Sequence, residues 1–292
     1  MHDSIFLASQ GSSILVDLGA LDKLKEKTEN VVYWNVAGNA ALIIFFKILG
    51  YTYEQIFYHL CDLKILNNTI NGSSLMPEDE EEKIKYMKEW LTEKINNNKL
   101  FQEDINLADI YKQTNIFPSF ILWSRNKKKI ININPNNYPE IKLIDVVLAS
   151  LTALGFFNQY QIKNTIFTNI FSVDCYPYLY SFRNDISDYF YLANILETNN
   201  KIENDLGPMQ DKENEIIGQF CDHNNFRINN IIKTLDTTKI IKIHSILYKG
   251  ELTNEAAIGL FKNGQLQAEA FLEERDTKLA SSEYLESINS QS

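Results

Sequence analysis

The sequence predicts an α/β fold built on a largely parallel sheet. Residues 5–8 form a short apolar run typical of a strand, and leucines at three-residue spacing after Ile14 indicate an amphipathic helix. A second β-rich run at 31–34 precedes an almost wholly apolar segment at 40–49, typical of a helix that is buried on all sides. This β-α-β-α order favours parallel strands, because a helix is the usual crossover between them.

The rest of the chain extends this pattern. Gly50 is placed to end the buried helix, and Thr52-Tyr53-Glu54-Gln55 fits a capping box for the next one. Helices are also expected within 76–98 and at 106–114, 143–154, 185–196, 253–261 and 265–274, and strands at 120–123, 130–133, 166–173 and 240–247. We expect one domain over residues 1–275, with a loop or insertion near 199–214 and a frayed polar tail over 276–292.

The composition is that of an acidic globular protein. The chain has 292 residues, of which 45% are hydrophobic and 23% charged, and its net charge is -10. This balance argues against a generic nucleic-acid binder and against electrostatic docking on anionic membranes, although it leaves room for a local basic patch. The run Arg125, Lys127, Lys128 and Lys129 is such a patch, and we interpret it first as a solvated turn between strands.

Cysteine usage and the N-terminus favour a cytoplasmic protein. The three cysteines, Cys61, Cys175 and Cys221, form no C-x-x-C pair, so we expect neither a disulfide framework nor a structural zinc site. No signal peptide or membrane span is expected, and no cofactor. The abundance of Asn, Ile and Lys is typical of AT-rich genomes, including those of large DNA viruses, in which case the location would be the host cytoplasm or the virion.

Four ordered blocks carry a resemblance to a known family. They are I-F-L-A-S-Q-G-S-S-I-L-V-D-L-G-A-L at 5–21, Y-W-N-V-A-G-N-A-A-L at 33–42, A-S-L-T-A-L-G-F-F at 149–157 and I-F-S-V-D-C-Y-P at 170–177. Together they resemble the patatin-like phospholipases, with a weaker match as far as residue 274. The resemblance implies a three-layer α/β/α sandwich and a serine–aspartate dyad.

The same resemblance implies that the catalytic machinery is lost. The family's glycine-rich oxyanion loop falls on Ser9, Gln10, Gly11 and Ser12, where Gly11 is the surviving glycine. The G-x-S-x-G elbow falls on Trp34, Val36 and Gly38, so that Val36 stands at the nucleophile. Asp174 matches the base of the dyad. We expect Val36 at the turn between a strand ending near Trp34 and a helix starting near Gly38, close in space to Gly11 and Asp174.

These expectations favour a catalytically inactive patatin homologue that acts as a binding or structural protein, with a protein or an acyl chain as its partner. Oligomerisation stays open. The alternative is a lipid acyl hydrolase with a displaced nucleophile, such as Ser12 or Ser13, although caps at the start of a helix are the favoured role for both. His59 and His244 are expected to be packed, hydrogen-bonded residues rather than general bases.

Overall fold

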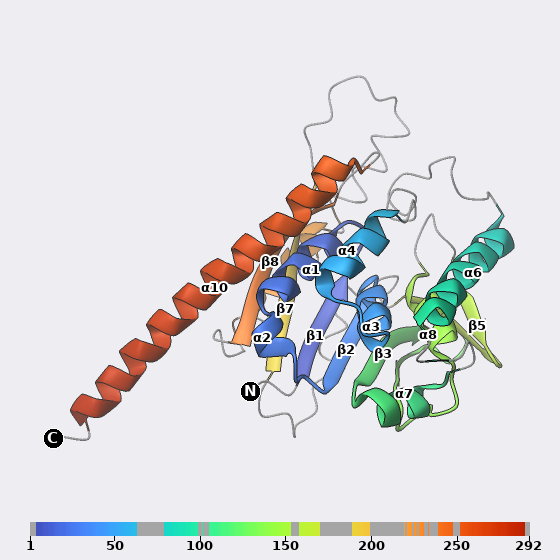
Figure 1. Ribbon diagram of the computed structural model, residues 1–292, viewed down its shortest axis with the longest axis horizontal. Coiled ribbons are helices and arrows are strands. Elements are labelled where there is room, and N and C mark those ends of the chain that lie inside the picture. The colour runs from blue at the N-terminus through green and yellow to red at the C-terminus, as the bar shows by residue number, and fades with distance from the viewer. Residues whose placement is uncertain are drawn as a thin grey trace.

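A mostly parallel sheet forms the centre of the protein (Figure 1). The computed structural model describes residues 4–62, 79–98, 101, 105–152, 158–169, 189–198, 219, 221–223, 225–226, 228–230, 233, 239–247 and 252–289. Its strands are β1 (Ser4–Ser9), β2 (Tyr33–Gly38), β3 (Phe117–Ser124), β4 (Lys129–Ile133), β5 (Tyr160–Ile162), β6 (Thr165–Asn169), β7 (Tyr189–Thr198) and β8 (Ile240–Leu247).

The strand order is β5-β6-β3-β2-β1-β7-β8, with β4 also paired to β3. The pairs from β3 through β8 in this order are parallel, whereas β4, β5 and β6 form antiparallel pairs. The predicted α/β class with a mainly parallel sheet is confirmed. Since parallel strands end at the same edge, β1 and β2 deliver Ser9 and Gly38 side by side, where they are register partners.

Helices cover one face of the sheet and bury the larger of two apolar cores there. They are α1 (Ser13–Lys23), α2 (Lys25–Thr28), α3 (Ala40–Ile48), α4 (Tyr53–Asp62), α6 (Glu80–Asn98), α7 (Leu107–Thr114), α8 (Leu143–Ser150) and α10 (Asn254–Asn289). The second core includes Phe6, Ala37 and Tyr191, and also Ile228 from a short helical stretch. The sheet is therefore packed on both faces, as its apolar strands require.

Local signals in the sequence explain several boundaries. Gly50 has a positive φ of 80° and follows α3 as predicted. Thr52 and Gln55 form the expected capping box, in which each backbone N–H donates to the other's side chain. The basic run indeed forms the turn of the β3–β4 hairpin, with Lys129 as the first residue of β4.

Two expectations about secondary structure are wrong. Residues 185–196 were expected to be helical, but Tyr189–Thr198 is strand β7, between β1 and β8. Two helices separated by Gly264 and a frayed tail were expected at the C-terminus, but α10 is one helix from Asn254 to Asn289. Helix α10 continues past residue 276, where the end of the domain was expected. That domain boundary stays a prediction. The insertion expected near 199–214 lies outside the described residues.

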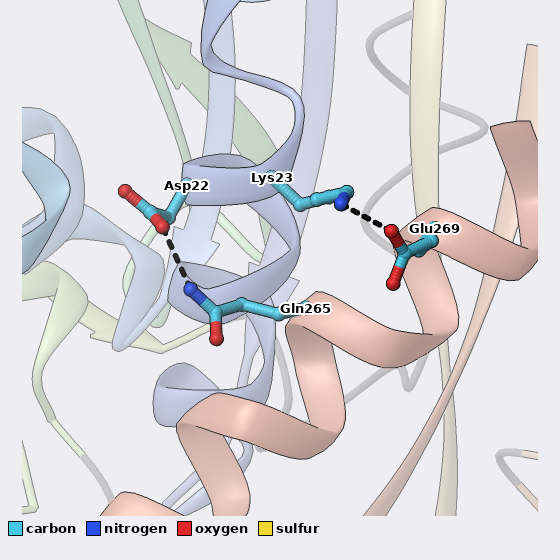
Figure 2. Close-up of polar contacts among 4 residues, drawn as sticks. All are labelled: Asp22, Lys23, Gln265 and Glu269. Carbon is cyan, nitrogen blue, oxygen red and sulfur yellow. Dashed lines mark hydrogen bonds and ion pairs between the residues drawn. The ribbon is translucent and has the colours of Figure 1, made fainter.

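The long helix α10 packs across α1 and then runs on past the sheet (Figure 1). At 1.5 Å per residue its 36 residues span about 54 Å. Figure 2 shows two polar contacts beside the crossing: Gln265 donates to Asp22 at 2.8 Å, and Lys23 pairs with Glu269. Gln265 and Glu269 are four residues apart, so they lie on the same face of α10.

Candidate functional site: the edge where β1 and β2 end

The turn from β2 into α3 is the site where an elbow nucleophile would stand. Strand β2 continues through Gly38, and α3 begins at Ala40 after the N-cap residue Asn39. Gly38 has a positive φ of 62° and is buried, so the residue on the sharp turn carries no side chain. A left-handed backbone at this point costs glycine little, whereas it strains residues with a Cβ.

Val36 therefore does not occupy the turn, and that expectation is wrong. It lies inside β2, where its register partners are Leu7 of β1 and Phe120 of β3. Its side chain is fully buried in the larger apolar core, as is that of Trp34, which is 1% exposed. The Trp34 indole N–H donates to the Val31 carbonyl at 3.1 Å, so this ring is a hydrogen-bonded core residue.

The loop after β1 is joined to this turn by hydrogen bonds. The backbone N–H of Asn39 donates to the Ser9 carbonyl at 2.9 Å, and the Asn39 side-chain amide donates to the Gly11 carbonyl at 3.4 Å. Gly11 has a positive φ of 47°, as a tight turn ahead of α1 permits. Asn39, which the sequence did not single out, thus connects the segment that the resemblance assigns to the oxyanion loop with the segment that it assigns to the nucleophile elbow.

The remaining loop residues have structural partners. Ser13 accepts a hydrogen bond from the Gln10 N–H at 2.8 Å, so its hydroxyl satisfies a backbone group of the loop and does not cap the first turn of α1 as expected. Ser12 is the N-cap residue of α1 but makes no side-chain cap hydrogen bond, so the cap expected of its hydroxyl is wrong. Both serines are fully buried, as is Ser9. None of the three hydroxyls is presented to solvent.

A buried polar network lies directly behind the loop, centred on Asp17 of α1. Oδ2 of this fully buried carboxyl accepts hydrogen bonds from Ser9 Oγ at 2.5 Å and from Asn194 Nδ2 at 2.9 Å. Ser245 of β8 donates to Asn194 Oδ1 at 3.1 Å. The network therefore joins β1, α1, β7 and β8 in the interior.

Burial decides the ionisation of Asp17. Desolvation raises its pKa to about 7, while the hydrogen bonds from Ser9 and Asn194 act in the opposite direction. Oδ1 has no hydrogen-bond partner among the described residues, which is consistent with a carboxyl that holds a proton near neutrality. A signal was present in the sequence: a single acidic residue interrupts the apolar run of α1.

Asp174, the residue matched to the dyad base, lies outside the described residues, so its expected proximity to Val36 and Gly11 stays a prediction. His59 is packed as expected, with its ring stacked on Phe46 at a centroid distance of 5.1 Å. His244 of β8 is exposed, so the expectation that it is packed is wrong. Cys61, near the end of α4, is partly buried, and Cys221 is buried.

The described part of the chain contains neither a candidate membrane-spanning helix nor a candidate metal cluster. None of its helices is both long enough and apolar enough to cross a membrane. The same residues contain no cluster of three or more His, Cys, Asp or Glu side chains that could hold a metal ion.

Comparison with known proteins identifies the fold. No family model and no curated protein sequence matches the chain. Among solved structures it is similar to VipD from Legionella pneumophila, with a TM-score of 0.60 and 13% identity over 94% of this chain and 67% of VipD. It is also similar to the type III effector protein ExoU, with a TM-score of 0.51 and 10% identity over 94% of this chain and 53% of ExoU.

The chain therefore spans about two thirds of VipD and about half of ExoU. At these identities the similarity concerns architecture, and it agrees with the resemblance found in the sequence blocks. The mostly parallel sheet flanked by helices is a patatin-like α/β fold.

Proposed function

We propose that this chain is a patatin-fold protein without acyl-hydrolase activity, acting as a binding or structural protein. The observation that carries the proposal is Gly38, the residue with positive φ on the turn between β2 and α3. In a G-x-S-x-G elbow the serine occupies that turn. Placing the elbow on Val36-Ala37-Gly38-Asn39-Ala40 moves the lost serine from Val36 to Gly38, and neither residue carries a nucleophilic atom.

The hydrogen bonds of the two adjoining segments support the same proposal. An oxyanion hole of this kind uses the N–H after the nucleophile together with an N–H from a nearby loop. Here the N–H after the turn belongs to Asn39 and donates to the Ser9 carbonyl, and the Gln10 N–H donates to Ser13. Donors that are satisfied within the protein are not aimed at a substrate oxygen.

In this proposal Asp174 has no nucleophile to activate. Asp174 matches the family's dyad aspartate in sequence, and we assign it a structural role. The partner would be a protein or an acyl chain, and cysteine content favours the cytoplasm as the compartment. Nucleic acid is disfavoured by the net charge of -10.

One observation favours a second candidate, hydrolysis by a displaced nucleophile. Ser9 Oγ donates to a carboxyl oxygen of Asp17 at 2.5 Å, and above about pH 7, where Asp17 is ionised, this is the pairing that a serine–aspartate dyad needs. Both side chains are fully buried, so a substrate carbonyl has no direct approach to Ser9 in this conformation. We rank this candidate below the non-catalytic one for that reason.

Hydrolysis assays separate the two candidates. The wild-type chain is incubated with a short-chain ester, with phospholipid vesicles and with a fluorophosphonate probe, beside an active serine acyl hydrolase as a positive control. We expect background turnover and no labelling, because loss of a serine nucleophile removes on the order of 10⁶ in turnover.

Variants identify the source of any activity that is seen. Turnover that disappears in Ser9→Ala, Ser12→Ala or Ser13→Ala would establish a displaced nucleophile and overturn the proposal. Turnover that disappears in Asp174→Ala would restore that residue as the base, with the same consequence. Turnover that survives all four substitutions would be assigned to a contaminant if it does not co-purify with the folded protein.

A further inference from the structure

The tip of the β3–β4 hairpin concentrates positive charge on an acidic protein. Its five residues, Arg125 to Lys129, include four cations, and all five are exposed. Arg125 donates to Gln159 at 2.8 Å, and none of the four cations makes an ion pair with the described part of the chain. We call residues 125–129 the basic tip.

The register places the basic tip beyond the edge that carries Ser9 and Gly38. Strand β3 runs parallel to β2, with Val36 opposite Phe120, so that Gly38 is level with Leu122. The strand then continues to Ser124 before the turn begins. The basic tip therefore projects past the edge of the sheet at which the turn between β2 and α3 lies.

The turn is held in a fixed shape rather than left as a loose loop. Asn126 accepts a hydrogen bond from Ser124 Oγ at 3.1 Å and donates to the Asn164 carbonyl of the β5–β6 turn at 2.8 Å. The Arg125 N–H donates to the Ile166 carbonyl at 2.9 Å. Two hairpins thus support each other, and the lysine side chains extend from a backbone that is already ordered.

The neighbouring turn shows a different arrangement of charge. Lys163, in the β5–β6 turn, pairs with Glu140 at 2.7 Å. The pKa of Glu140 is lowered chiefly by its hydrogen bond from Lys163. The basic tip has no comparable acidic partner within the described residues. Because salt screens charges beyond about 8 Å at physiological ionic strength, the local cations matter more to an approaching surface than the net charge does.

Apolar side chains lie immediately behind the basic tip. Trp123 of β3 and Ile130 of β4 are cross-strand partners that pack against the smaller core and stay partly exposed. A tryptophan beside an aliphatic residue, followed by a group of cations, is the combination suited to the boundary between lipid headgroups and acyl chains. A soluble polyanion has no apolar phase, so it would contact the cations of the basic tip and not the two apolar side chains.

We propose that the basic tip docks this protein on an anionic lipid bilayer, so that the edge bearing Ser9 and Gly38 faces the membrane. This gives the binding role proposed above a specific partner, but it depends on different residues and on no catalytic step. A hydrolysis assay can therefore contradict the previous proposal without affecting this one, and vesicle binding can fail while the chain remains inactive.

Vesicle co-sedimentation of the full chain tests the proposal. The probes are vesicles of phosphatidylcholine alone and vesicles that also contain phosphatidylserine, each at low and at high salt. The test variant is Lys127→Gln/Lys128→Gln. Its control is Lys25→Gln/Lys27→Gln, which removes the same charge from exposed positions on α2, a helix that precedes β2 at the opposite edge of the sheet.

We expect the wild type to bind the anionic vesicles selectively and to lose this binding at high salt. Each cation near such a surface contributes about fivefold in partition, so the tip variant should bind on the order of 25-fold more weakly while the control stays within about twofold of wild type. Thermal melts of all three proteins check that the variants fold.

Three outcomes would overturn the proposal. The first is equal binding to both kinds of vesicle. The second is an equal loss in the tip variant and the control, which would reflect net charge alone. The third is tip-dependent binding to single-stranded RNA without binding to anionic vesicles, which would assign the tip to nucleic acid.

Discussion

Gly19 of α1 and Gly264 of α10 lie at a helix crossing so close that neither position has room for a Cβ. A methyl group built on Gly19 would come within 1.9 Å of the Phe261 carbonyl oxygen, and one on Gly264 within 1.9 Å of the Val16 carbonyl oxygen. Both obstructing atoms are backbone, so they cannot move aside as a side chain would. The seam between α1 and α10 therefore depends on two glycines that are 245 residues apart in sequence.

Replacing Gly264 by alanine should destabilise the protein. Alanine is favoured over glycine in a helix by about 1 kcal/mol, but overpacking costs about 1–3 kcal/mol and here acts against backbone. Because the obstructing atom is backbone, we expect a cost at the upper end of this range and a net loss of about 2 kcal/mol, measured by chemical denaturation. Gly259→Ala is the matched control, because Gly259 is exposed on the same helix and its Cβ would meet nothing within 4 Å. A stabilised Gly264→Ala variant would contradict the close crossing.

The polar contacts that flank the crossing should matter much less. Lys23 and Glu269 form an ion pair whose side chains are 37% and 48% exposed. Exposed pairs of this kind contribute about 0–1 kcal/mol, so Lys23→Ala should lower the free energy of unfolding by less than about 1 kcal/mol. Chemical denaturation of Lys23→Ala and Gly264→Ala in parallel compares the two losses. A larger loss for Lys23→Ala would mean that the contact between α1 and α10 is stabilised mainly by its charges.

The sequence was most informative where local chemistry decides the structure. The capping box at Thr52 and Gln55, the glycine at position 50 and the β3–β4 hairpin were predicted from a few adjacent residues and are present. Strand β7 was misread as helix because a strand that is buried on both faces has a continuous apolar pattern, which periodicity does not distinguish from a buried helix.

The elbow shows a different limit of sequence reading. Only one glycine of the motif survives near the turn. A single glycine can be aligned either with the serine of G-x-S-x-G or with its last glycine. The backbone dihedral of Gly38 decides between these registers, and the sequence does not contain it. The hydrogen bonds of Asn39 and the network around Asp17 were missed because they join segments that the fold, and not the sequence, brings together.

The protein should become less stable as pH rises through the range in which Asp17 ionises. Its pKa in the folded state is about 7, raised by burial from an ordinary value of 3.8. The folded protein therefore binds more protons than the unfolded chain between about pH 4 and pH 7, and linkage gives a loss of stability of at most about 1.4 kcal/mol per pH unit as pH rises. Below about pH 4 this contribution is fully present, and above about pH 7 it is lost.

The Asp17→Asn variant tests the origin of that slope. Asparagine cannot ionise, so the difference in unfolding free energy between wild type and variant should change steadily between about pH 4 and pH 7 and level off on both sides. Denaturation titrations at a series of pH values measure it. Parallel profiles for the two proteins would mean that Asp17 does not titrate in the folded state.

Installing a serine at the turn should not create an acyl hydrolase. In Gly38→Ser the new side chain would require a φ of 62°, which costs a non-glycine residue about 1–2 kcal/mol, so a modest loss of stability is expected. Its hydroxyl would stand where an elbow nucleophile belongs, yet the next N–H would still donate to the Ser9 carbonyl. Each missing oxyanion donor costs roughly 10² to 10³ in rate, so fluorophosphonate labelling should stay near background.

Val36→Ser is the control, since it places a hydroxyl in the core, where it should lower stability by about 2–4 kcal/mol without any labelling. Rapid labelling of Gly38→Ser, matching an active serine hydrolase, would show that Asn39 can release its N–H to a substrate and that the nucleophile alone is missing.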